Sequence, residues 1–106
     1  MNYLESLLEV VKKIENEDTD FIVGARQISE FRDYFISNPT NLLNYNDLAV
    51  FFDIEFEASG IPVSLDERKI WNEEALKIKD EEIKIIREKY SGKVKEACEK
   101  IIQKSL

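Results

Sequence analysis

Apolar side chains recur every three or four residues along most of this sequence, and this spacing restricts its fold more than any other feature. Spacing of this kind puts the apolar residues on one face of an α-helix. We predict a helix over about residues 3–17 and a second over about 20–37, the latter capped by Thr19 or Asp20. The residues that form the two apolar faces are Leu4, Leu7, Leu8, Val11 and Ile14, then Phe21, Ile22, Ala25, Ile28, Phe31 and Phe35.

The C-terminal part carries a longer repeat. Its apolar residues are separated by 3, 4, 4, 3 and 4 positions, which is close to the 3.5-residue period of helices packed side by side. They are Ile83, Ile86, Tyr90, Val94, Ala97 and Ile101. This seam predicts a long last helix, bent or interrupted at Ser91-Gly92. Helix starts are predicted at Asn72 and at Asp80, because acidic residues follow both and favour a helix N-terminus.

Residues 40–63 fit two structures. Leu48, Phe51 and Phe52 have helical spacing, whereas Phe52, Ile54 and Phe56 alternate with Asp53, Glu55 and Glu57 as in a half-buried strand. Gly60 followed by Pro62 commonly ends a helix, and a lone strand would have no partner. We favour the helix. A capping box, Ser64 to Glu67, predicts a short helix through Trp71.

The length and composition complete the fold prediction. A chain of 106 residues makes one domain, and only three glycines and two prolines leave little room for many tight turns. We therefore predict an all-α single domain, a bundle of four to five helices with a long C-terminal helix. Gly24 should mark the close approach of a neighbouring helix, and Asn38-Pro39 should end the second helix.

The residue types disfavour a catalytic site or a metal site. There is no histidine, Cys98 is the one cysteine, and the three glycines are isolated, so the usual general base, thiolate metal sites and phosphate-binding loops are missing. Asp53, Glu55 and Glu57 lack the spacing of a calcium loop. We predict no enzyme activity, no metal and no cofactor. Cys98 and Trp71 are interpreted as core residues, and Arg68 as the partner of its acidic neighbours.

The acidic charge is unevenly distributed. The net charge of -7 disfavours nucleic acid as a partner. Residues 1–63 hold 12 acidic and 4 basic side chains, against 10 and 11 in residues 64–106, and no lysine or arginine lies between Arg32 and Arg68. We name the acids of that interval the middle acidic tract and expect them to lack a counter-charge: Asp33, Asp47, Asp53, Glu55, Glu57, Asp66 and Glu67.

The first residues do not have the pattern of a signal peptide, since acids and lysines interrupt the apolar positions. No apolar run approaches the roughly 18 residues that cross a bilayer. We expect a soluble, cytoplasmic protein that does not act at a membrane.

Residues 54–98 resemble a small bacterial family of helical proteins with no established activity. The resemblance rests on the order and spacing of Ile54, Glu55, Glu57, Ile61, Pro62, Val63, Arg68, Trp71, Ala75, Leu76, Lys79, Asp80, Glu82 and Ile83, with Ala97-Cys98 near the end and Val23 to Arg32 upstream. Ser64 stands where the family pattern has glycine, and one additional residue precedes Arg68. The resemblance implies a bacterial, helical domain. By analogy of size and acidity, such proteins are similar to the immunity proteins that bacteria make against their own toxins.

Together these features favour a non-catalytic immunity protein that neutralises a basic, nuclease-type toxin, for example one of a contact-dependent system. A cationic toxin surface would attract an acidic cover and hold it by charge complementarity. The expected binding residues are Asp53, Glu55, Glu57, Asp66 and Glu67, with Phe52 or Phe56 as apolar anchors. The alternative is a homo-oligomeric or adaptor-type helical protein in which the C-terminal seam pairs with a second copy.

Overall fold

The computed structural model describes residues 3–37, 43, 45–61 and 65–105, and within them every regular element is an α-helix. There are six: α1 (Tyr3–Glu15), α2 (Phe21–Ser29), α3 (Arg32–Ser37), α4 (Tyr45–Ala58), α5 (Leu65–Arg68) and α6 (Glu73–Lys104). The predicted all-α class and the long C-terminal helix are confirmed. The number exceeds the predicted four to five because the single helix predicted over 20–37 is two helices, α2 and α3.

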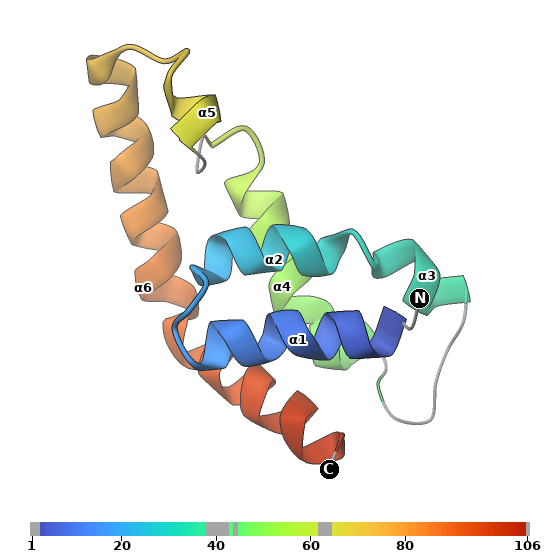
Figure 1. Ribbon diagram of the computed structural model, residues 1–106. Coiled ribbons are helices and arrows are strands. Elements are labelled where there is room, and N and C mark those ends of the chain that lie inside the picture. The colour runs from blue at the N-terminus through green and yellow to red at the C-terminus, as the bar shows by residue number, and fades with distance from the viewer. Residues whose placement is uncertain (1–2, 38–42, 44, 62–64, 106) are drawn as a thin grey trace.

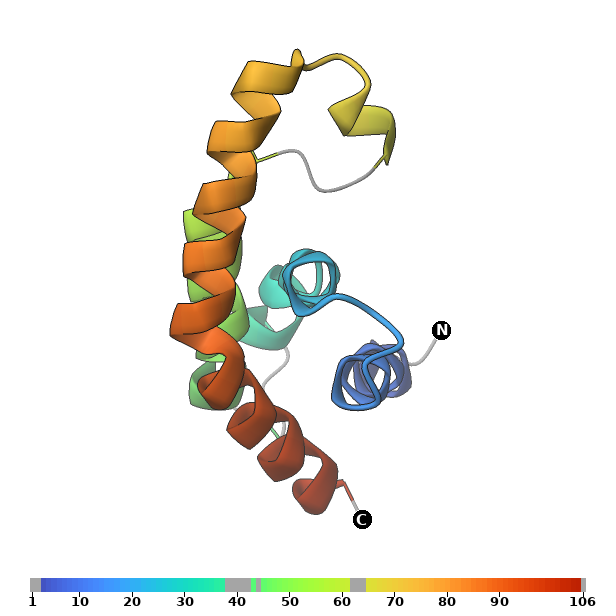
Figure 2. The same cartoon turned by 90° about the vertical axis from the view of Figure 1, so that its left-hand side faces the viewer.

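The helices form two layers. α4 and α6 lie side by side and antiparallel, since Glu57 near the end of α4 meets Lys89 while Asp47 at its start meets Lys104. α1 and α2, also antiparallel, cover one side of this pair (Figure 1). Figure 2 shows the opposite side of the α4–α6 layer without a covering helix. One side of that layer is therefore core and the other is surface.

The core is one continuous cluster between the two layers, as expected of a single domain. Its fully buried side chains include Leu7, Ile22, Phe51, Ile54 and Ile101. α6 contributes only the part from Ile83 onward. Its first ten residues, 73–82, include no buried side chain, and in Figure 1 they rise beyond α1, α2 and α4 with only α5 nearby.

The turn between α1 and α2 follows local backbone rules. Glu17 has a left-handed backbone, with φ of 62°, and the amide of Asp18 donates to the carbonyl of Lys13 at 2.9 Å, which is a Schellman end to the helix. The predicted cap is confirmed, because Asp20 accepts a hydrogen bond from the amide of Ile22 at 3.1 Å. The turn brings α1 and α2 into direct contact.

Gly24 confirms the prediction of a close helix approach. A Cβ atom at this position would lie 2.6 Å from Cγ1 of Ile14, nearer than real side chains permit. Glycine is therefore what lets α2 pack this tightly against the end of α1.

Within the segment that fitted both a helix and a strand, Tyr45–Ala58 is a helix, α4. Gly60 follows it with φ of 83°, a conformation that glycine adopts without strain. The confirmed helix decides which side chains of the middle acidic tract can share a face.

Three boundary predictions are corrected. The helix predicted over 20–37 breaks at Glu30-Phe31, where Phe31 and Tyr34 contact Tyr3 of α1. No helix starts at Asp80, because its carboxylate binds Arg68 instead of capping a helix, and α6 runs on from its cap Asn72. α5 ends at Arg68 and does not reach 71.

The remaining boundary predictions concern α6 and two loops. α6 is continuous through Ser91-Gly92, and Figure 1 shows it bending in its C-terminal half, as helices do at such pairs. The predicted roles of Asn38-Pro39, Pro62 and Ser64 lie outside the described residues. Among the helices of the described residues, none combines the length and the apolar character that a bilayer crossing requires.

Candidate partner-binding surface

The three acids of α4 do not form one surface. In a helix, residues two positions apart point to different sides, so the alternation Asp53, Glu55, Glu57 sends Glu55 away from the other two. Glu55 points to α2, Glu57 points to α6, and Asp53 is exposed on the outer side. A strand would have put all three carboxylates on one face, whereas the helix separates them.

Arg26 of α2 neutralises two of the predicted binding residues. Its guanidinium contacts the carboxylates of Glu55 at 3.4 Å and Glu67 at 3.0 Å, and donates to the carbonyl of Ile61 at 3.5 Å. One cation thus ties α2, the end of α4 and α5 together. Arg26 lies 41 positions from Glu67, and no sequence pattern indicated this pairing.

The last helix neutralises two more acids of the middle acidic tract. Nζ of Lys89 lies 2.6 Å from Glu57, and Nζ of Lys104 lies 2.8 Å from Asp47. The hydrogen bond from Lys89 lowers the pKa of the Glu57 carboxyl below its usual value and raises the pKa of Lys89 itself. The expectation that this tract lacks a counter-charge is therefore wrong: the counter-charges come from α2 and α6.

Asp53 and Asp66 keep most of their exposure. Asp66 is the solvent-exposed partner of Lys69, at 3.6 Å, within the same short segment. For Asp53, the described residues supply no cation at ion-pair distance. Of the five predicted acids, Asp53 is the one whose charge is both outward and uncompensated among the described residues.

Asp53 shares its side of the helix with aromatic residues. We name this side the outer face of α4; it consists of Tyr45, Ala49, Phe52, Asp53 and Phe56. Phe56 is 84% exposed, whereas Phe52 is half-buried, with its ring 5.2 Å from that of Tyr45 and 5.7 Å below the guanidinium of Arg32. Both predicted anchors and one predicted acid are thus brought together.

α5 holds the beginning of α6. Arg68 pairs with both carboxylate oxygens of Asp80, at 2.8 and 3.1 Å, and this lowers the pKa of Asp80. This partner of Arg68 thus lies in α6, twelve positions along the chain. Trp71 is half-buried outside the core cluster, with Nζ of Lys79 5.7 Å from the ring centre, so its interpretation as a core residue is wrong.

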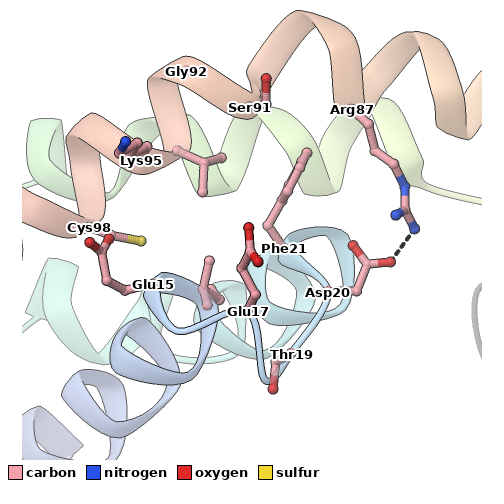
Figure 3. A pocket seen from close by; sticks show the side chains of 12 residues that line it. Glu15, Glu17, Thr19, Asp20, Phe21, Arg87, Ser91, Gly92, Lys95 and Cys98 are labelled. Carbon is pink, nitrogen blue, oxygen red and sulfur yellow. Dashed lines mark hydrogen bonds and ion pairs between the residues drawn. The ribbon is translucent and has the colours of Figure 1, made fainter.

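An open pocket of about 610 Å³ lies between the α1–α2 turn and α6 (Figure 3). Figure 3 shows Phe21 reaching toward α6, beside the ion pair of Arg87 with Asp20. Cys98 is fully buried, as predicted, and burial raises its thiol pKa to about 12, which keeps it protonated and unreactive. Among the described residues no three potential metal ligands gather, here or elsewhere.

A second exposed face was missed by the sequence reasoning. Positions separated by 4, 3, 4 and 3 residues follow one stripe along the outside of α6, which we name the outer stripe: Glu74, Ile78, Glu81, Ile85 and Glu88. Ile78 is 63% exposed and Ile85 is 61% exposed. The signal was present, because these two isoleucines stand seven positions apart and outside the seam that was assigned to the core.

The seam itself is already occupied. Ile83, Ile86, Tyr90, Val94 and Ile101 are buried in the core of the same chain. A second copy could use this seam only if the core opened. A homo-oligomer built on the C-terminal seam would therefore have no exposed seam residues with which to pair.

Comparison with protein families, with curated proteins and with solved structures finds no match to this chain. The features of this chain that bear on its function are therefore those of its own surface, chiefly the outer face of α4.

Proposed function

We propose that this chain is a binding protein without catalytic activity, and that it neutralises a basic bacterial toxin in the manner of an immunity protein. Its contact surface is the outer face of α4, with Phe56 as the anchor and Asp53 at its edge. The middle acidic tract as a whole is no longer the proposed surface, because most of its acids serve ion pairs within the fold.

The exposure of Phe56 carries the proposal. A phenylalanine that leaves 84% of its surface in water forgoes most of the roughly 1.5–3 kcal/mol that its burial could supply. It could have been polar at no cost to the fold, since α4 already buries Leu48, Phe51 and Ile54 on its other side. Aromatic side chains of this kind dominate the binding energy of protein interfaces.

Charge supports a basic partner. The net charge of -7 attracts a cationic protein over a distance and repels phosphate backbones and anionic membranes. At the surface itself Asp53 offers an outward carboxylate that the described residues do not engage. Steering by the whole molecule and anchoring by Phe56 then act together, the first on the association rate and the second on the dissociation rate.

The test is to express the chain together with the product of the gene immediately upstream. Co-purification of the two proteins and rescue of cell growth are the expected results. Phe56→Ala should weaken the isolated complex about 30-fold, the effect of losing a hot spot of about 2 kcal/mol. Asp53→Lys should slow association, and more so at low salt.

Ile70→Ala is the matched control, because Ile70 is 85% exposed but lies outside the outer face of α4. It should bind as the wild type does. Failure of the wild-type chain to bind or protect overturns the proposed function. Binding that Phe56→Ala and Ile70→Ala affect equally keeps the function but removes the outer face of α4 as its surface.

A further inference from the structure

The beginning of α6 has an unusual position in the fold. Residues 73–82 have no buried side chain; Arg68 of α5 holds them through Asp80, and Trp71, which follows α5, lies against Lys79. These ten residues extend a helix whose later turns are packed in the core, so they can stay helical without core contacts of their own. The projecting turns present a surface that the core does not require.

That surface is patterned like one half of a helix pair. The outer stripe places Ile78 and Ile85 at one position of a heptad and Glu74, Glu81 and Glu88 at the other. None of these glutamates has a cation at ion-pair distance among the described residues. The pattern therefore offers two apolar contacts alternating with three carboxylates that make no ion pair among the described residues.

The flanks of the stripe differ from each other. On the side toward α4 the charged residues form ion pairs within the chain, Lys89 with Glu57 and Glu82 with Lys79. On the other side Lys77 and Lys84 are exposed. A complementary helix would therefore carry cations along its centre and an acid on the edge that meets these two lysines.

We propose that the outer stripe of α6 is a docking site for a basic amphipathic helix of a partner protein. The occupant carries branched or straight apolar residues against Ile78 and Ile85, and lysine or arginine against the three glutamates. This site is separate from the outer face of α4, and the inference does not depend on the proposed function.

Charge selects this occupant over the others. A second copy of the chain lying parallel would place the glutamates of one stripe against those of the other, and like charges facing each other disfavour association. A second copy lying antiparallel would set the glutamates of each stripe against the isoleucines of the other, which would bury carboxylates among apolar side chains. Nucleic acid and anionic lipid would be repelled by the same three carboxylates. A cationic helix is the ligand class that satisfies both the apolar and the charged positions.

The probe is a synthetic three-heptad peptide with leucine at the apolar position, lysine at the central charged position and glutamate on one flank. Its twin carries glutamate in place of the central lysines. Fluorescence anisotropy of the labelled peptides against the full chain should show the basic peptide binding at least 10-fold tighter than its twin. Ile85→Glu and Glu81→Lys should each weaken that binding at least 10-fold.

Glu30→Lys is the control for Glu81→Lys, since it makes the same change of charge at an exposed position away from α6. It should leave the affinity within about 2-fold, as should Phe56→Ala. Unchanged far-UV circular dichroism and melting temperature show that the variants are folded. Amide shifts on peptide addition should be confined to the first half of α6.

Three results would overturn the proposal. The first is that the basic peptide fails to bind at low salt. The second is that Glu30→Lys weakens binding as much as Glu81→Lys does, because the attraction would then come from net charge alone. The third is that sedimentation shows a dimer that Ile85→Glu dissociates, because a second copy would then be the occupant. Loss of toxin binding in Phe56→Ala with peptide binding intact separates this site from the proposed function.

Discussion

The two halves of α6 use the same kind of residue in opposite ways. From Ile83 to Ile101 the helix buries its apolar seam between α1 and α4, while from Glu73 to Glu82 no side chain is fully buried and Ile78 is exposed. Figure 2 shows the difference, since the upper part of α6 stands clear of the layer that covers the lower part. One continuous helix thus serves as core in one half and as surface in the other, and local sequence composition alone does not separate the two.

The sharpest test of this difference is truncation of one isoleucine in each half. Ile101→Ala should lower the free energy of unfolding by about 2–5 kcal/mol, because it leaves a cavity in a fully buried site. Ile78→Ala should change it by less than about 0.5 kcal/mol, as surface substitutions do. Urea denaturation of both variants measures the two values. Equal losses would mean that the first half of α6 is packed as tightly as the second.

Glycine substitutions extend the comparison to the backbone. Gly24→Ala should lower the free energy of unfolding by about 1–3 kcal/mol, because the new methyl group overlaps Ile14. Gly92→Ala should raise it by up to about 1 kcal/mol, since nothing lies within 4 Å of its Cβ position and alanine favours the helix. Thermal or urea unfolding reports both. In an Ile14→Ala background, Gly24→Ala should cost less than it does in the wild type if the overlap is the cause.

The N-cap tests how independent the projecting half is. The side chain of Asn72 accepts a hydrogen bond from the amide of Ala75 at 2.8 Å, so Asn72→Ala should cost about 1 kcal/mol locally. Hydrogen exchange should speed up for amides of residues 75–80 and stay unchanged from Tyr90 to Ile101. Asn72→Asp retains a capping oxygen and should protect these amides as the wild type does. A uniform increase along α6 would instead show that the two halves open together.

The smallest effect is expected at the ion pair of Glu57 with Lys89, where the second half of α6 meets α4. The folded state has the lower pKa at Glu57, so this carboxylate stabilises the fold above its unfolded pKa, and the contribution is lost as the pH falls through the folded pKa. The gap in stability between wild type and Glu57→Gln should therefore be full near pH 7 and close below about pH 4. Asp53→Asn should show no comparable gap. Stability curves from pH 3 to pH 7 would measure both, and a gap that persists in acid would exclude the ion pair as its source.

The local patterns in the sequence were enough for most of the helices. Leu4 to Ile14 and Ile83 to Ile101 repeat at helical spacing, and the cap residues Asp20 and Asn72 open α2 and α6 where predicted. These features act between neighbours along the chain, so they can be read without the fold. The prediction of a helix start at Asp80 failed because it used only neighbouring residues. Asp80 has the sequence context of a cap, but Arg68, twelve positions away, binds its carboxylate.

The candidate surface was only partly predictable. Phe52 and Phe56 are four positions apart, so they share a face in a helix and in a strand alike. The choice of helix over strand implied, in addition, that Asp53, Glu55 and Glu57 could not all lie together. The prediction that Trp71 lies in the core was wrong because the sequence around an aromatic residue after a capped turn is the same whether the core covers the ring or a single lysine does.

The sequence by itself determined the helices, the close contact at Gly24 and the overall acidic charge, because spacing, glycine content and composition are properties of the chain. Only the tertiary structure decided which charges remain available. Arg26 reaches Glu55 and Glu67, and Lys89 reaches Glu57, across 29 to 41 positions of sequence, because helix packing brings distant side chains within hydrogen-bond distance. Folding thus neutralises the middle acidic tract from outside it, and leaves Asp53 with Phe56, and the outer stripe of α6, as the exposed surfaces that a partner can meet.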